Sequence, residues 1–321
     1  MTKGAIKLFF KFLLRRILYV IPMLLITTLI VYSFILLIPG DPVLTLLGEN
    51  ATPEKVAQLR QQLGLDHSII SQYFDWLINA LKGDLGRSVF TGQYVHEAVI
   101  ERLAVTFQLV VVAMIISVFG GMFFAITSTF SPNSWIDYVS RFFGTLGTAL
   151  PNFWLAMLLI LFFSLHLGWV PATGFTSITE NPVEFFKGIL LPAISLGAVG
   201  TAQITRHLRS SLMEVMSADY IRTAYSKGVN RWQAILKHGI QNAMLPVVTT
   251  IGILFGHLLG ATVVIETVFA IPGIGQLAVN SILQHDFTML QGVVLIMIVM
   301  VILINFITDI VYALLDPRIE Y

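Results

Sequence analysis

The chain has 321 residues, of which 56% are hydrophobic and 12% are charged, and its formal net charge is +1. Soluble domains carry about 25% charged residues, so this composition argues against an ordinary cytosolic enzyme, a nucleic-acid-binding protein and a disordered scaffold. The chain contains no cysteine, which excludes disulfides, thiolate metal sites and cysteine nucleophiles and leaves the redox compartment open.

Long charge-free stretches predict helices that cross a membrane, because a helix needs about 20 apolar residues to span the hydrocarbon core. The first stretch is longer than the roughly 7–15 apolar residues of a signal peptide, so we interpret it as a retained span. In chain order, the expected spans are about 17–38, 104–130, 142–165, 188–206, 244–266 and 288–314. The sequence therefore predicts an all-α polytopic membrane protein with six transmembrane helices in a single domain, 1–321.

The distribution of basic residues orients these helices, since Lys and Arg gather in cytoplasmic loops. Residues 1–16 carry basic side chains and no acid, and the loop at 207–243 is rich in Lys and Arg. In the segment 39–102, by contrast, acids outnumber bases. We therefore expect both termini and the 207–243 loop in the cytoplasm, and 39–102 on the outer side.

The extracytoplasmic insertion at 39–102 is too long and too patterned for a simple connector. Thr52-Pro53-Glu54 has the order of an N-cap, a first-turn proline and a first-turn acid, which predicts a helix that Gly64 ends. A second, amphipathic helix is expected from Asp66 to Lys82. This outer cap either only stabilises the bundle or offers a docking or gating surface, and the sequence favours neither.

The cytoplasmic loop at 207–243 contains signals for two short helices. Ser217 supplies a hydroxyl N-cap and Asp219 a first-turn acid. Gly228 can adopt the left-handed conformation that ends a helix, and Asn230 can begin the next helix. The loop is therefore predicted to be ordered and closely tied to the spans on either side.

The first of these helices presents small side chains on one face. Tyr220, Ala224 and Gly228 follow one another at four-residue spacing. A basic interfacial helix could bind anionic lipid, but lipid binding does not require small residues. We interpret this face as a surface that fits a groove of another protein.

Span five and the segment after it carry further patterns. Its glycines Gly252, Gly256 and Gly260 recur at a spacing that lets helix backbones approach closely, and we expect them to pack helices. The segment 267–286 reads poorly as a span because Pro272, Gly273 and Gly275 interrupt it. Since such backbone must be covered by protein or line a wet cavity, we expect a re-entrant or interfacial outer segment.

Two acids lie near membrane depth, where ionisable residues are candidates for function. Glu266 stands at the outer end of span five and either lines a gate or translocation path or is simply exposed to water there. Asp309 lies towards the inner end of span six, where structural pairing with a neighbouring helix is favoured.

Ordered motifs then relate the chain to a known family. The run 223–228 (Thr-Ala-x-x-x-Gly), followed by 243–246 (Ala-Met-Leu-Pro), resembles the cytoplasmic coupling motif of ABC importer permeases. Arg222 and Thr223 replace the Glu and Ala of the general motif, and the Gly-to-Pro distance is longer, as is usual in the dipeptide, oligopeptide and nickel branch. Other segments that resemble this branch are 38–42, 63–66, 83–86, 209–214, 219–224, 266–269, 272–275 and 316–318.

The resemblance implies a type I ABC importer permease fold in a bacterial inner membrane. It implies a second permease subunit, usually a different chain, so that the pair is a heterodimer within the lipid bilayer. It also implies two cytoplasmic ATPases that use ATP and Mg²⁺, and an extracytoplasmic solute-binding protein. On this resemblance, the residues expected to couple to the ATPase are Glu214, Asp219, Tyr220, Arg222, Thr223, Ala224 and Gly228. From the position of an acid near membrane depth beside a Pro-Gly break, the residues expected at the path or gate are Glu266, Pro272, Gly273 and Gly275.

The chain lacks Gly-x-x-x-x-Gly-Lys-Ser/Thr, the loop that holds nucleotide phosphates. We therefore expect a permease subunit that is not an enzyme and binds no cofactor, with ATP hydrolysis on partner chains. The seven histidines are scattered without an i, i+4 pair, so no metal site is expected. Nothing in the sequence suggests a nucleic-acid partner.

The expected function is to form half of the translocation path for di- or oligopeptides. Nickel or other metal chelates and glutathione-like compounds are alternatives within the same family. An ion-coupled secondary transporter is a further alternative, which the broken segment around Pro272 would suit. An intramembrane enzyme is disfavoured, because no paired His, Asp, Glu or Ser occurs at helical spacing within the spans.

Overall fold

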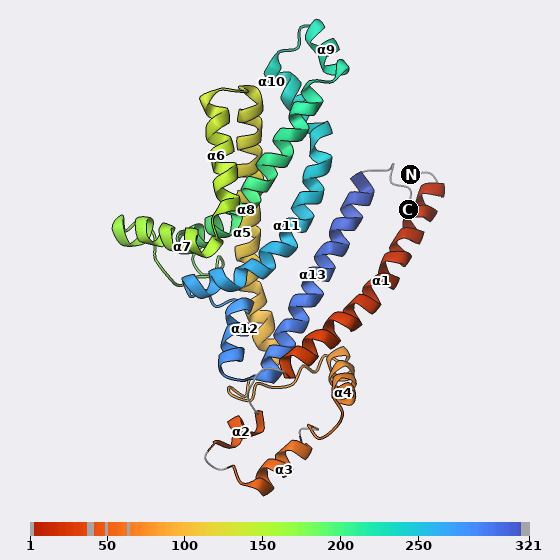
Figure 1. Ribbon diagram of the computed structural model, residues 1–321, viewed down its shortest axis with the longest axis vertical. Helices are drawn as coiled ribbons and strands as arrows, with labels where there is room; N and C mark the ends of the chain where they lie inside the picture. Colours follow the sequence, from red (N-terminus) through yellow and green to blue (C-terminus); the bar gives the residue numbers. More distant parts are fainter. Residues whose placement is uncertain (1–2, 37–41, 49–50, 63–64, 316–321) are drawn as a thin grey trace. The chain divides into compact units, whose positions relative to one another are not determined.

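The computed structural model describes residues 3–36, 42–48, 51–62 and 65–315, and its helices are labelled in Figure 1. The described residues form helices and connecting turns, with a single isolated bridge between Arg87 and Tyr94. The chain divides into two compact units. Unit 1 consists of 1–106 and 272–303, and unit 2 of 107–271 and 304–321.

Unit 1 contains the first span, the outer insertion and the segment that follows span five. Its helices are α1 (Lys3–Leu36), α2 (Pro42–Leu47), α3 (Pro53–Gln62), α4 (Ile69–Leu81), the start of α5 (Val95–Phe130), α12 (Ile274–Leu283) and most of α13 (Phe287–Leu315). Its core joins Val95 and Val99 of α5 to Ile274 of α12 and to Leu290 and Val293 of α13. Unit 1 is therefore a packed body with its own core.

Unit 2 is built around one long helix, α8. Its elements are the rest of α5, α6 (Trp135–Ala149), α7 (Asn152–Leu159), the π-helical turn η2 (Ile160–His166), α8 (Pro182–Met216), α9 (Asp219–Ser226), α10 (Arg231–Gln233), the π-helical turn η3 (Ala234–Gly239), α11 (Ile240–Phe269) and the end of α13. A Cβ at Gly197 of α8 would lie 2.7 Å from the Ala113 carbonyl oxygen of α5. A Cβ at Gly147 of α6 would lie 2.8 Å from the Ala198 carbonyl oxygen of α8. Small residues thus let α8 cross α5 and α6 at backbone contact.

The helices of the outer insertion form where their cap residues predict. Helix α3 begins at Pro53 with Glu54 in its first turn, and α4 occupies most of the interval from Asp66 to Lys82. The N-cap of α4 is Ser68, whose hydroxyl accepts a hydrogen bond from the Ser71 N–H. The prediction missed the short helix α2, and the expected stop at Gly64 lies outside the described residues.

Four helices of the described chain are long and apolar enough to cross a membrane, namely α5, α8, α11 and α13. Within α1, the described side chains cover a shorter apolar stretch, Leu18–Ser33. The six-span count therefore stays a prediction, whereas the polytopic α-helical class is clear.

The expected span at 142–165 is not one straight helix. Helix α6 ends at Ala149 and α7 begins at Asn152, and the two are bent by 111°. The cause is Pro151, because a proline disfavours the helical conformation at the residue before it. Leu150 accordingly has an extended backbone with ψ 132°. The segment forms a bent pair, visible where α7 leaves α6 in Figure 1.

The boundaries around the two predicted loops also differ from expectation. Helix α8 continues to Met216, so the first residues of the 207–243 loop extend the span. In 267–286, α11 runs on to Phe269, Ala270 takes a left-handed conformation with φ +52°, and α12 follows. The segment is therefore helical on both sides of a short break, and its place at the membrane surface stays a prediction.

Candidate functional site

The predicted coupling helix is present as α9, but it begins differently from expectation. The predicted N-cap role of Ser217 is wrong, because its hydroxyl donates to the Glu214 carbonyl oxygen at 2.7 Å and so closes the end of α8. Ala218 is the N-cap and offers no side-chain hydrogen bond, while Asp219 is the expected first-turn acid. Only two residues, Ser217 and Ala218, separate α8 from α9.

The end of α9 follows the prediction. Gly228 has φ +85°, in the left-handed region that favours glycine. Its N–H donates to the Tyr225 carbonyl oxygen at 2.9 Å, and the Val229 N–H donates to that of Ala224 at 3.2 Å. This pair of bonds is a Schellman motif. A Cβ at Gly228 would meet no described atom within 4 Å, so the requirement for glycine here comes from backbone conformation.

One face of α9 is held against its own unit and the rest is open. Ile221 is fully buried, and the helix contacts η3. Tyr220 is 47% exposed, and Arg222 and Thr223 are also exposed, whereas Ala224 is half-buried. Arg222 forms an exposed ion pair with Asp219 at 3.7 Å. The residues singled out for contact with a partner are thus accessible, as is Glu214 at the end of α8.

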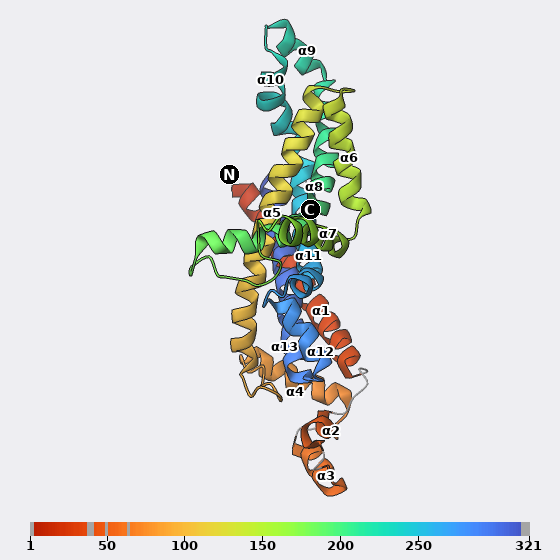
Figure 2. The ribbon, with the colours of Figure 1, turned by 90° about the vertical axis from the view of Figure 1, so that its left-hand side faces the viewer.

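The chain that follows α9 is fastened to the end of α5. Asn230 is the expected N-cap, and its Oδ1 accepts the Gln233 N–H at 2.8 Å. Arg231 donates to the Thr129 carbonyl oxygen at 3.0 Å, and the rings of Trp232 and Phe130 meet edge to face at 5.5 Å. Figure 2 shows α9 and α10 at the end of unit 2 where α8 ends. The loop is therefore held to the end of α5 by a hydrogen bond and a ring contact.

A buried carboxylate, which the sequence did not single out, joins α5, α6 and α8. Asp137, at the start of α6, is fully buried and contacts Ser128 of α5 and Arg141 of α6. Arg209 of α8 donates to both of its oxygens, from Nε to Oδ1 at 3.0 Å and from Nη2 to Oδ2 at 3.1 Å. The Asn133 N–H also donates to Oδ2 at 3.0 Å. We call Ser128, Asp137, Arg141 and Arg209 the inner clamp. The available signal was the i, i+4 spacing of Asp137 and Arg141 beside a span.

The candidate gate residues belong to different units. In unit 2, Glu266 is fully buried, and its backbone carbonyl accepts the Ile271 N–H at 2.8 Å. The alternative that Glu266 is a water-exposed surface acid is therefore wrong. In unit 1, the Pro272 carbonyl oxygen accepts a hydrogen bond from Arg102 at 3.2 Å, and Gly273 and Gly275 are buried.

The three glycines of α11 have different surroundings. A Cβ at Gly252 would overlap the side chain of Thr308 in α13, so the two helices approach closely there. At Gly256 it would lie 3.9 Å from Asn305 Oδ1, and at Gly260 it would meet no described atom within 4 Å. Asp309 is half-buried. Among the described residues, no group of three or more His, Asp or Glu side chains could hold a metal ion.

Comparison with known proteins decides the family. The model of the binding-protein-dependent transport system inner membrane component matches residues 117–321, and the N-terminal model of the corresponding membrane components matches residues 9–110. The chain belongs to this family. It is the multi-pass inner-membrane permease component of a transport system, and not an enzyme.

Relatives of this permease cover nearly its whole length. A putative peptide transport system permease protein of Brucella suis biovar 1 is 38% identical over 96% of this chain and 98% of its own. The dipeptide transport system permease protein of Alkalihalophilus pseudofirmus is 37% identical, with the same two shares. The glutathione transport system permease protein of Salmonella choleraesuis is 39% identical over 97% and 99%.

Solved structures agree on the fold. The MetNI methionine ABC transporter in an inward-facing conformation matches with a TM-score of 0.53, over 69% of this permease and 96% of that chain, at 19% identity. An amino acid ABC transporter with histidines matches at 0.50, over 70% and 95%, at 16% identity. The permease therefore has the fold of ABC transporter membrane subunits.

Proposed function

We propose that this permease forms half of the translocation path of an ATP-driven importer for di- or oligopeptides. An external binding protein delivers the peptide, a second and different permease chain completes the path, and two cytoplasmic ATPases supply the energy. The observation that carries the substrate class is the near full-length likeness to relatives named peptide and dipeptide permeases. The identity to a glutathione permease is comparable to the identity to the peptide permease. The proposed substrate class therefore includes short, modified peptides such as glutathione.

In this mechanism α9 is the contact with the ATPase. Its exposed side chains, Tyr220, Arg222 and Thr223, would lie in a groove of the ATPase, with Ala224 and Gly228 allowing close approach. Two features support this role: the Schellman ending at Gly228, and the two-residue link to α8. Closure of the ATPases on ATP would move α9, and α8 and α11 would carry that motion into the membrane as a change between two states.

At the outer end, Glu266 and the segment Pro272–Gly275 are proposed to act at the path or gate. Two observations support this role. Glu266 is a fully buried acid in an apolar helix, and intramembrane acids are functional candidates. The Pro272 carbonyl accepts a hydrogen bond from Arg102, which gives the broken backbone a polar partner.

Uptake by the assembled transporter in proteoliposomes tests the substrate class. A labelled dipeptide should accumulate only with ATP and binding protein, and unlabelled tripeptide should compete. Competition by a nickel chelate alone, or by glutathione alone, would select the corresponding alternative. Uptake that continues without ATP under an ion gradient would identify a secondary transporter.

Gly228→Asp tests the role of α9 separately. A side chain at φ +85° costs roughly 1–2 kcal/mol in the left-handed region, and the acid would also meet the ATPase groove. We expect peptide uptake to fall by about tenfold or more while the permease stays in the membrane in wild-type amounts. Gly168→Asp is the matched control, because Gly168 has φ +65° and equally open surroundings away from α9. Normal uptake by the Gly228 variant would contradict the proposed contact.

A further inference from the structure

Helix α4 of the outer insertion has three faces of different chemistry. One face packs on the first span through Tyr73 and Trp76. The second carries Ser71, Asp75 and Asn79, which are exposed and polar. The third is apolar and also exposed, with Ile70 at 64%, Phe74 at 52%, Ile78 at 47% and Leu81 at 80%. We call Ile70, Phe74, Ile78 and Leu81 the apolar stripe of α4.

The packed face fixes α4 to the first span by specific polar contacts. Tyr73 is 2% exposed, and its hydroxyl donates to the Leu25 carbonyl oxygen of α1 at 3.0 Å. The Tyr73 and Thr28 hydroxyl oxygens lie 2.9 Å apart. The Tyr32 ring of α1 lies 5.5 Å from that of Trp76. These contacts fall within the apolar stretch Leu18–Ser33 of α1.

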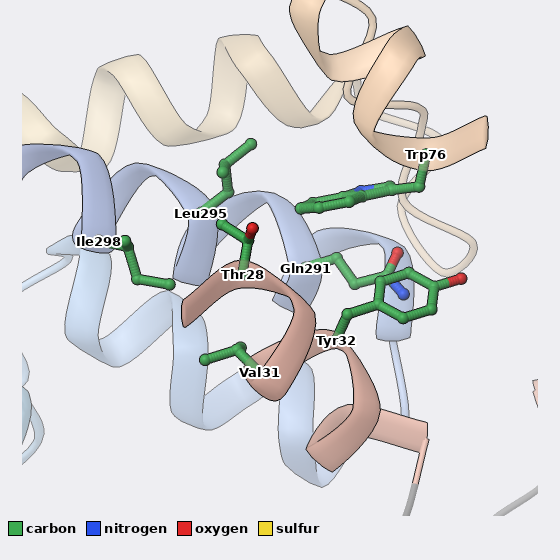
Figure 3. Close-up of a pocket in the computed structure, with 7 residues that line it drawn as sticks. All are labelled: Thr28, Val31, Tyr32, Trp76, Gln291, Leu295 and Ile298. Atoms are coloured by element: carbon green, nitrogen blue, oxygen red, sulfur yellow. The ribbon is translucent and has the colours of Figure 1, made fainter. Parts of the chain in front are cut away.

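A pocket lined by α1, α4 and α13 shows which turns of α1 and α13 lie beside α4. Figure 3 shows Trp76 of α4 reaching between side chains of α1 and α13, and the pocket also includes Thr28, Leu295 and Ile298. Thr28 lies about two turns before the end of α1 at Leu36, and Leu295 lies about two turns after the start of α13 at Phe287, roughly 12 Å in each case. Measured from the end of α1 and from the start of α13, Trp76 therefore lies beside the second turn or deeper in both helices.

A helix at this level that turns large apolar side chains away from its own protein meets the bilayer. The apolar stretch of α1 on which α4 packs also exposes large apolar side chains, with Ile26, Leu29 and Ile30 38–59% exposed. The polar face of α4 lies on the other side of the stripe, as expected of a helix lying in the membrane interface. Trp and Tyr side chains are also typical of that interface.

We propose that α4 is an in-plane membrane helix, with its apolar stripe in the acyl region of the outer leaflet and its polar face towards water. The 39–102 insertion would then not be an entirely extracytoplasmic cap, because residues 69–81 belong to the membrane. The occupant of the stripe is lipid. The proposal rests only on unit 1 and does not depend on the substrate or on the ATPases.

The absence of cysteine from the chain allows a clean test by single-cysteine spin labelling. Ile70→Cys, Phe74→Cys and Ile78→Cys place labels on the stripe, and Ser71→Cys, Asp75→Cys and Asn79→Cys are matched controls one position further along the same helix. Each variant is assembled into the complete transporter in phosphatidylethanolamine–phosphatidylglycerol nanodiscs. Collision rates with oxygen, which concentrates in lipid, are compared with those of a water-soluble nickel chelate. All six positions are exposed, so the labels should not disturb folding.

We expect the ratio of oxygen to nickel-chelate collisions to be several-fold higher at 70, 74 and 78 than at 71, 75 and 79. Equal ratios on the two faces would overturn the proposal, because the stripe would then be in water. Protection of 70, 74 and 78 from both reagents would overturn it too, since another protein chain would then cover the stripe.

Discussion

Asp137 is a fully buried acid that joins α5, α6 and α8 in unit 2. A carboxylate removed from water is costly unless charged partners and hydrogen bonds surround it. Here Arg209, Arg141, Ser128 and the Asn133 N–H satisfy it, and these groups come from α5, α6, α8 and the turn before α6. The inner clamp holds α8 through Arg209, and α9 begins two residues after α8 ends. The clamp therefore fixes the helix to which α9 is connected.

Asp137→Asn should therefore destabilise the permease more than an ordinary charge removal. The variant leaves Arg209 without its buried counter-charge, and breaking a buried pair from one side costs on the order of 3 kcal/mol. The measurement is the unfolding midpoint of the purified permease in detergent. Glu184→Gln is the control, since it removes an exposed ion pair with Lys187 at 2.9 Å, which contributes less than about 1 kcal/mol. Equal losses in the two variants would show that the buried clamp contributes no more to stability than an exposed ion pair.

At the scale of helices, local signals predicted the elements better than their ends. Asn230 and Ser217 are both good N-cap residues, yet only Asn230 caps a helix, because α8 extends to Met216 and takes the Ser217 hydroxyl for its own last turn. Pro151 was visible in the sequence, but apolar composition alone predicted a straight span. The bend follows from the extended backbone that Pro151 imposes on Leu150.

The same limit applies to contacts between helices. A repeated glycine predicts a face that allows close approach, but which glycine meets a neighbour depends on where the helices cross. Gly252 meets Thr308, whereas Gly260 has no described atom within reach of a Cβ. Asp137 was missed for a similar reason, since nothing local reveals that Arg209, far along the chain, would reach it.

At the scale of the whole chain, the bent pair α6–α7 decides the topology. The basic N-terminal arm and the basic loop that contains α9 belong on one side of the membrane, which requires an even number of crossings between them. In the predicted six-span topology α1, α5 and α8 supply three crossings, so that topology requires the bent pair to supply the fourth. Contacts within unit 2 agree: the loop before α6 adjoins Thr129, which Arg231 contacts, whereas the Gly174 N–H after η2 donates to the Phe269 carbonyl oxygen at the far end of α11, 3.0 Å away.

We therefore predict that residues 131 and 173 lie on opposite sides of the membrane. In the cysteine-free chain, Thr173→Cys should react with an impermeant maleimide added outside right-side-out vesicles, whereas Ser131→Cys should react only after permeabilisation. Lys227→Cys, next to Gly228, serves as the cytoplasmic reference. The physical reason is that α11 is long enough to cross the bilayer. The Gly174 N–H bonds to its Phe269 end, whereas residue 131 follows the end of α5, which Arg231 of α10 contacts in the chain that precedes α11. If both cysteines reacted from the same side, the bent pair would be a re-entrant loop. The odd number of crossings would then place α9 outside, where no cytoplasmic ATPase could reach it.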